Sequence, residues 1–476
     1  MFGSIRTRSL DTIEQTWSFA LSRGTGTTVL VLQMAKSPSQ THLLHEVLVK
    51  LRKAHPLLCV KLHHNPTTNE WSFLKSDARQ VDIQFHDLQS TSAFFRTLST
   101  PIEQNPNNIN NHHNLSPCHL ILEHELNDRS WPDPGSFPSN GTDVVFARVY
   151  ALSDTRSAIV LRLHASVCDR TTAVSLLREL MELAAEAEGG KGTGPGVKND
   201  GLEGKMGIES MVPSGMGRKT MWAHGMDMLG YGVNSFRLTN LKFKNTKGPR
   251  SSQVVRLQMN VQQTEGILAT GCKSRGIKLC GALAAAGLIA AHSTKHESDQ
   301  LKKKYGLVTL TDCRSLLEPA LSTHHYGFYH SAVLNTHTLK GADSFWDLAE
   351  RTYNDFARYK KCNKHFSDMA DINYLMRKAI ENPSLTSSSS LRTSIISVFE
   401  DPVIDNSKKM QQEIGVEDYV GCASLHGIGP SVGLFDTIRD GELDCACVYP
   451  SPLHSREQMN ELVGHMKKIL ISESSK

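Results

Sequence analysis

The sequence predicts an α/β protein made of two halves, and three observations lead to this class. Runs of apolar and β-branched residues alternate with segments of helical periodicity in both halves of the chain. Residues 189–217 hold many of the glycines, with lysine and serine and almost no aromatic residue, which is typical of a connector. The 476 residues are enough for two cores. We therefore expect an N-terminal domain (1–188), a crossover linker (189–219) and a C-terminal domain (220–476).

Composition and charge exclude several classes of protein. The 52 basic and 48 acidic residues leave a net charge of +4, whereas a general nucleic-acid binder carries a concentrated basic face. The ten cysteines lack paired zinc-type spacing and suit free thiols in a reducing compartment. The first residues lack the apolar run of a signal peptide, and the apolar helix around 282–291 is too short to cross a bilayer. We expect a cytoplasmic monomer that neither spans a membrane nor binds nucleic acid.

The chemistry is expected in residues 155–188. Residues 157–164 alternate as a strand that ends in His164, and apolar residues recur at helical spacing from Thr171 onward. Asp169 stands just before this helix, where a carboxylate caps free backbone N–H groups. This order predicts an imidazole in a protected cleft, where His164 acts as a general base. The alternative is a core histidine beside a helix cap.

The other elements of the first half follow from local pattern. Strands are expected at 24–34, 56–62 and 144–152, a helix at 39–55, and a hairpin loop at 153–156 that delivers the strand of His164. Residues 103–117 and 128–142 are polar loops. His112 and His113 lie in the first loop, and we interpret them as solvated residues rather than metal ligands.

The second half repeats the alternation of helices and strands. The expected strands are 253–259, 307–314, 391–399, 419–425, 431–439 and 442–449, and the expected helices are 261–274, 280–292, 343–361 and 455–470. Asp440 and Gly441 form a tight-turn signal. His324, His325 and His330 have no carboxylate or cysteine at ligand spacing, so we interpret them as surface or core histidines and predict no metal site.

The order of strand, His164, short loop, Asp169 and amphipathic helix resembles the acyl-CoA-dependent acyltransferase superfamily. This superfamily includes BAHD enzymes, chloramphenicol acetyltransferase, alcohol acetyltransferases and the condensation domains of peptide synthetases, and its mark is His-x-x-x-Asp-Gly after a strand. Here His164 and Asp169 are five positions apart, Cys168 stands at the expected aspartate position, and Arg170 replaces the glycine.

Further segments carry the same resemblance. Residues 51–58 (LRKAHPLL) are similar to the superfamily's early helix-to-strand step, and 272–286 are similar to the small-residue helix of its second domain. Residues 307–314 resemble the "VDxR" segment. The BAHD signature Asp-Phe-Gly-Trp-Gly is absent, and residues 431–436 (SVGLFD) occupy the corresponding place. The chain thus resembles a divergent relative of the alcohol acetyltransferase and condensation branch.

The resemblance implies two chloramphenicol-acetyltransferase-like α/β domains, with mixed sheets flanked by helices and an active-site channel between them. It implies acyl transfer from acyl-CoA, as co-substrate, to a small acceptor with a hydroxyl or amine, and no tightly bound cofactor. His164 would take the acceptor's proton, Arg314 would pair with Asp169 to fix the loop, and Ser431 is a candidate for the oxyanion site. The residues that bind the co-substrate, the acyl donor and the acceptor are not identified.

Two other classes stay open. The altered spacing and Arg170 suit a catalytically inactive condensation-fold protein that serves as a binding or interaction module. A hydrolase with a Cys168–His164 pair would need the thiolate to meet the imidazole ring. Adjacent strand-end positions make that contact awkward.

Overall fold

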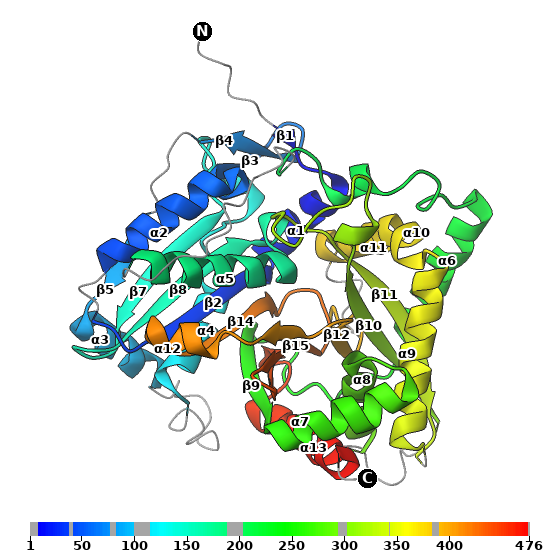
Figure 1. Cartoon of the computed structure of the whole chain (residues 1–476). Coiled ribbons are helices and arrows are strands. Elements are labelled where there is room, and N and C mark those ends of the chain that lie inside the picture. The colour runs from blue at the N-terminus through cyan, green and yellow to red at the C-terminus, as the bar shows by residue number, and fades with distance from the viewer. Residues whose placement is uncertain are drawn as a thin grey trace.

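The predicted α/β class is confirmed: mixed sheets flanked by helices form two lobes (Figure 1). The computed structural model describes residues 8–37, 41–76, 82–99, 115–187, 203–293, 302–341, 343–382 and 390–474. The predicted loop at 103–117 lies largely outside these residues, and His112 and His113 lie there entirely.

The N-terminal lobe is built on a five-stranded sheet of order β14-β2-β8-β7-β5. Its strands are β2 (Thr25–Met34), β5 (Ile83–His86), β7 (Val145–Ala151), β8 (Ser157–His164) and β14 (Val416–Leu425). Helices α2 (Thr41–Ala54) and α5 (Arg170–Ala187) pack together on one face, and α4 (Pro117–Asn127) packs on the other. Because strand side chains alternate, Leu161 and Leu163 join the core under α5 while Val160 joins the core at α4.

A small four-stranded sheet of order β1-β4-β3-β6 lies beside this lobe. Its strands are β1 (Arg8–Ser9), β3 (Val60–Asn65), β4 (Glu70–Lys75) and β6 (Thr142–Asp143). The predicted strand at 56–62 begins only at Val60. Pro56 opens a 3₁₀ turn, Pro56–Cys59, because its ring fixes φ near the helical value and it has no N–H for a sheet.

The C-terminal lobe contains a seven-stranded sheet of order β11-β10-β12-β15-β16-β9, with β13 paired to β15. Its strands are β9 (Ser251–Met259), β10 (Lys303–Asp312), β11 (His330–Leu339), β12 (Ile396–Phe399), β13 (Val403–Asp405), β15 (Val432–Arg439) and β16 (Glu442–Ser451). The predicted turn between β15 and β16 is present, and both Asp440 (φ 46) and Gly441 (φ 87) have positive φ, as a type I′ turn requires. The predicted strand at 391–399 is shorter, because regular pairing starts at Ile396.

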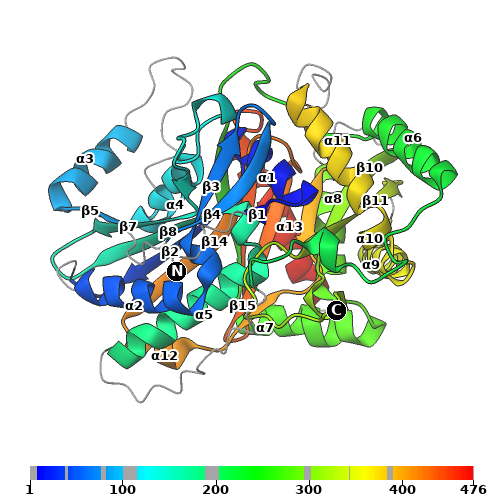
Figure 2. The ribbon, with the colours of Figure 1, turned by 90° about the horizontal axis from the view of Figure 1, so that it is seen from above.

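Helices cover the C-terminal sheet and line the junction. Helix α8 (Leu279–Ser293) is buried on nearly all sides, and its alanines allow α9 (Phe345–Lys361) and α13 (Arg456–Ser474) to pack closely. Helix α1 (Thr12–Ser22) packs against α11 (Met369–Glu381) where the lobes meet (Figure 2). The remaining α-helices are α3 (Leu88–Ser99), α6 (Met221–Arg237), α7 (Val261–Glu265), α10 (Lys364–Ser367) and α12 (Lys408–Glu413).

One strand from the second half of the chain completes the sheet of the first half. Strand β14 pairs antiparallel with β2, with Tyr419 opposite Leu32, so the two sheets do not separate along the sequence at residue 188. Residues 188–202 lie outside the described part, and the 3₁₀ turn Ile208–Met211 follows. The three-part division of the sequence stays a prediction.

In the described residues, no single helix has the length and apolar character needed to cross a membrane. One bent pair, Val261–Arg275 with Leu279–Ser293 at 105°, meets the criteria by length and composition alone.

Candidate functional site

A cavity of about 500 Å³ lies where the two lobes meet, and its lining is mostly apolar. The N-terminal lobe contributes β2, the loop after β8 and the first turns of α5. The C-terminal lobe contributes the strands β10, β11, β12 and β15, and β14 and α11 complete the wall. A cavity of this volume with few polar groups is typical of a small-molecule site.

The loop after β8 contributes the carboxylate of Asp169 to the wall of this cavity. Strand β8 ends at His164, a short 3₁₀ turn spans Ala165–Val167, and Asp169 caps α5 by accepting from the backbone N–H of Thr172 at 2.8 Å. The other oxygen of Asp169 accepts from the backbone N–H of Tyr329 at 2.8 Å, so the loop is tied to the opposite lobe. Asp169 is therefore both a helix cap and a link between the lobes.

The predicted pairing of Arg314 with Asp169 is present in the structure. The two guanidinium Nη atoms of Arg314 donate to the two carboxylate oxygens at 2.9 and 3.0 Å, and both side chains are almost fully buried. Burial alone would raise the pKa of Asp169, but the charge of Arg314 and the hydrogen bond from His330 hold it far below its usual range. A bidentate pair of this kind is rigid and directional.

His164 lies in the core of the N-terminal lobe and is not among the residues that line the cavity. Its ring is 0 % exposed and packs edge-on against Trp131, with ring centroids 5.4 Å apart. The backbone N–H of Ser166 donates to Nδ1 at 3.1 Å, which places the ring proton on Nε2. Burial lowers the pKa of His164 to about 3. This geometry does not support the expectation that His164 faces an open channel, because strand alternation points its side chain to the face shared by Arg162.

Ala165, not His164, stands four positions before Asp169, the spacing in the superfamily's His-x-x-x-Asp mark. Ala165 lines the cavity. When the mark is aligned on Asp169 instead of on His164, the position of its histidine therefore holds the methyl group of Ala165.

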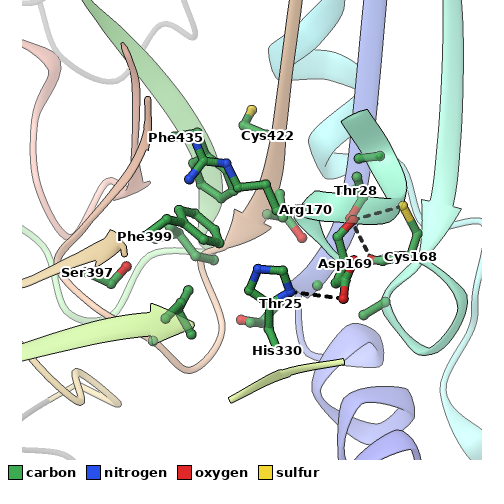
Figure 3. Close-up of a pocket in the computed structure, with 18 of the residues that line it drawn as sticks. Thr25, Thr28, Cys168, Asp169, Arg170, His330, Ser397, Phe399, Cys422 and Phe435 are labelled. Atoms are coloured by element: carbon green, nitrogen blue, oxygen red, sulfur yellow. Dashed lines mark hydrogen bonds and ion pairs between the residues drawn. The ribbon is translucent and has the colours of Figure 1, made fainter. Parts of the chain in front are cut away.

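His330 is a cavity residue that the sequence did not single out. It opens β11 opposite Asp312 of β10, and its ring lines the cavity. Nδ1 of His330 lies 2.9 Å from Oδ2 of Asp169 (Figure 3). In the sequence, His330 was one of several histidines without metal-ligand spacing, and it was interpreted as a surface or core residue. A signal was available in its position at the start of the strand that follows Arg314, since neighbouring antiparallel strands place such ends together.

Arg170 occupies the position of the superfamily's glycine and reaches across the cavity wall. Its Nη2 lies 3.0 Å from Oδ1 of Asp436, and its Nη1 donates to the carbonyl of Asp401 at 3.2 Å. Its guanidinium lies 4.1 Å from the ring centre of Phe399, and both residues are labelled in Figure 3. Burial raises the pKa of Asp436 above its usual value. Arg170 therefore ties α5 to the C-terminal lobe and narrows the cavity on the side of β15.

Two other residues considered from the sequence, Cys168 at the cavity wall and Ser431, lack the contacts that their expected roles need. Burial raises the pKa of Cys168 well above its usual value, and its thiol donates to its neighbour's carbonyl, which does not support a Cys168–His164 hydrolase. Ser431 is buried, does not line the cavity, and its hydroxyl has no partner among the described residues. It is therefore poorly placed to stabilise an oxyanion.

One cluster of carboxylates outside the cavity has the spacing of a metal site. Among the described residues, Asp227, Asp368 and Asp371 bring their oxygens together. The ammonium group of Lys219 contacts all three and donates to Asp371 at 2.8 Å. The ammonium groups of Lys219 and Lys364 thus already form ion pairs with these carboxylates.

Comparison with known proteins defines the class of the fold. No protein-family model and no curated protein matches the sequence. Solved structures match over nearly its whole length, and the chain has the chloramphenicol-acetyltransferase-like fold of condensation domains and related acetyltransferases. The resemblance seen in the sequence is confirmed for the fold.

Three solved structures illustrate the similarity. The cyclization-docking bidomain of the EpoB peptide synthetase from Sorangium cellulosum superposes with a TM-score of 0.65 at 11 % identity, covering 99 % of this chain and 85 % of that one. The TRI3 trichothecene 15-O-acetyltransferase from Fusarium sporotrichioides gives 0.64 at 9 % identity, covering 98 % and 95 %. Polyketide synthase associated protein 5 from Mycobacterium tuberculosis gives 0.60 at 15 % identity, covering 98 % of both chains.

Proposed function

We propose that the protein transfers an acyl group from a thioester, with acyl-CoA as co-substrate, to a small acceptor that carries a hydroxyl or an amine. One observation supports this assignment above the others. The rigid Asp169–Arg314 pair stands at the wall of a mostly apolar cavity that both lobes enclose. A fixed polar group in a cavity of low polarity is the arrangement that acyl transfer needs, because water is excluded where charge develops.

The cavity suits the reacting ends of both substrates. Its apolar lining buries an acyl chain, at about 25 cal/mol for each Å² of apolar surface removed from water. Its volume fits an acyl group and a small acceptor together, so the nucleotide end of a coenzyme would lie outside. Holding both partners in one enclosed space makes their encounter effectively intramolecular.

The reaction itself moves one proton and exchanges one bond. The acceptor's oxygen or nitrogen loses its proton to a base and attacks the thioester carbonyl carbon. The carbon–sulfur bond then breaks, and the thiolate leaves as a thiol. A positioned base contributes about 10²–10⁴-fold to such a step, and its identity is considered below.

A thiol-release assay tests this function. Acetyl-CoA, malonyl-CoA and aromatic acyl-CoAs are each mixed with a panel of alcohols and amines, and mass spectrometry detects the acylated acceptor. Ala332→Phe fills the cavity from β11, whereas Thr336→Phe adds the same ring on the same strand outside the cavity. We expect release by the wild type and by Thr336→Phe, and a loss of at least tenfold in Ala332→Phe. Release equal to the protein-free background with every donor would refute the proposal.

A non-catalytic binding module is the second candidate, and the alanine at position 165 favours it. In that case the cavity would bind an apolar acyl compound without turnover. Calorimetry with the same donors separates the two functions. The protein would belong to this class if the wild type binds a donor without releasing thiol and Ala332→Phe abolishes that binding.

A further inference from the structure

The imidazole of His330 reaches the carboxylate of Asp169 from the C-terminal lobe. Among the described residues that line the cavity, His330 is the only histidine. We propose that His330, held by Asp169, is the general base of the acyl transfer and supplies the imidazole that the loop after β8 does not present to the cavity. This assignment rests on the proposed function.

The hydrogen bond between the two residues sets the tautomer of His330. Asp169 is ionised, because its pKa is held far below the usual range, so its oxygen accepts the Nδ1 proton at 2.9 Å. The lone pair is then on Nε2, and the only hydrogen bond of the ring within the described residues is the one from Nδ1. Figure 3 shows one ring nitrogen facing Asp169 and the other turned away from it, among the lining side chains. A basic atom is thus presented where an acceptor would lie.

The surroundings hold the carboxylate and the ring in register. The bidentate pair with Arg314 fixes the plane of the Asp169 carboxylate, and the N–H of Tyr329, next to His330 in the chain, donates to the same oxygen as the imidazole. Phe399 packs edge-on against the imidazole at 5.8 Å, with an angle of 85° between the rings. Only 8 % of His330 is exposed. Catalytic groups perform best when packing and hydrogen bonds fix them before the substrate arrives.

The position of Ala165 explains how a base from the other lobe can act here. The resemblance implies an imidazole from the loop after β8, four positions before the aspartate. In this chain the methyl group of Ala165 lies at that position and leaves space in the same cavity that His330 lines. The carboxylate is retained, and it holds an imidazole that comes from β11 instead of from the loop.

The proposed step balances as follows. Nε2 of His330 takes the proton from the acceptor's O–H or N–H, and the electron pair of that oxygen or nitrogen forms a bond to the thioester carbonyl carbon. The carbon–sulfur bond breaks, and its electron pair leaves with the sulfur. The imidazolium returns its proton to the thiolate. The products are an ester or amide and a free thiol, and His330 is restored.

Steady-state kinetics on the full chain test the assignment. We expect His330→Gln to lower kcat for thiol release at least 100-fold while calorimetry finds the donor's Kd changed less than threefold. His324→Gln, a matched change at a partly exposed histidine outside the cavity, should keep kcat within twofold. Thiol release by His330→Gln at the wild-type rate would overturn this assignment and leave the proposed function standing. If the wild type releases no thiol with any donor, both the proposed function and the role of His330 are refuted.

A chemical probe does not depend on turnover or on the fold of a variant. Diethyl pyrocarbonate acylates accessible, unprotonated imidazole nitrogens, and peptide mass mapping locates the product. We expect modification of His330 that a bound acyl-CoA prevents, and no modification of His164. Modification of His164 rather than His330 under conditions that modify His324 would contradict the proposed orientation.

Discussion

His164 and His330 differ in the property that decides which of them can do chemistry. His164 is five positions from Asp169 in the sequence, yet its ring is enclosed in the N-terminal lobe. His330 is 161 positions away and lies within hydrogen-bond distance of the same aspartate, in the cavity. Proximity in the sequence therefore brings the backbones together but does not bring the functional groups together.

The cause of this difference is local geometry. His164 is the last residue of β8, so strand alternation directs its side chain to the face of Arg162 and under Trp131. The 3₁₀ turn that follows redirects the chain, so that Asp169 faces the C-terminal lobe. One histidine is thus a part of the core, and the other is a part of the boundary between the lobes.

The largest effect is expected when the shared carboxylate is removed. Asp169→Ala leaves Arg314 as a buried cation without its bidentate partner, and breaking a buried pair costs about 3–5 kcal/mol of unfolding free energy. It also frees the ring of His330, so thiol release should fall with stability. Urea denaturation followed by circular dichroism measures the first effect, and the release assay measures the second.

A double variant separates stability from chemistry. Asp169→Leu combined with Arg314→Met removes both charges from the buried pair, so we expect most of the lost unfolding free energy to return while activity stays absent. If Asp169→Ala lowers the unfolding free energy by less than 1 kcal/mol, the ion pair does not hold the two lobes together. Asp169 would then not be the rigid group that orients His330.

The next largest effect is expected in the pH dependence of stability, because a histidine buried in the core destabilises the fold at acidic pH. In the unfolded chain its pKa is about 6.5, whereas burial lowers the folded value to about 3. Between these two pKa values the unfolded state binds a proton at His164 and the folded state does not. His164 therefore leaves the unfolding free energy unchanged above pH 6.5 and lowers it below that pH. Between pH 6.5 and pH 4 the loss is about 3 kcal/mol, at 1.4 kcal/mol for each pH unit.

His164→Gln isolates this contribution, because glutamine does not titrate. We expect the variant to have a flatter dependence of unfolding free energy on pH between 6.5 and 4 than the wild type, and an unchanged kcat. His337, His365, His426 and His454 also have pKa values lowered to about 4 and contribute equally to both proteins. If the unfolding free energies of wild type and variant depend on pH in the same way, the burial of His164 seen in the structure is contradicted.

Local pattern predicted most of the elements but not the site. Strand β8, helix α5 and the Asp440–Gly441 turn follow from alternation, helical periodicity and turn chemistry, which act within a few residues. The pairing of β14 with β2 joins segments almost 400 positions apart, as in the contact of Val420 with Val31, and no local signal encodes it. Fold class was therefore predictable, whereas the exchange of a strand between lobes was not.

The candidate site was predicted in part for the same reason. Asp169 and Arg314 were identified through the resemblance, and their ion pair is present. The placement of His330 depends on the register of β10 with β11, which sets Asp312 opposite His330 and so brings the imidazole beside the loop of Asp169. That register is a property of the folded sheet. The sequence alone shows that Ala165 stands four positions before Asp169. The prediction nevertheless chose His164, one position earlier, because it is the histidine nearest to that spacing.

A smaller effect would sharpen the comparison by moving the imidazole back to the loop. Ala165→His places a histidine four positions before Asp169, at the spacing of the superfamily's mark, and Ala165 already lines the cavity. In a His330→Gln background, where the cavity keeps its space and Asp169 keeps its pairing with Arg314, we expect the new imidazole to restore kcat about tenfold. The thiol-release assay measures this rescue, and Ala165→Gln in the same background is the matched control for bulk. Rescue by histidine alone would show that the cavity needs a base and accepts it from either lobe. Equal rates in the two double variants would instead mean that the position of the imidazole on β11 matters beyond its basicity, because it is from that strand that His330 makes its orienting hydrogen bond to Asp169.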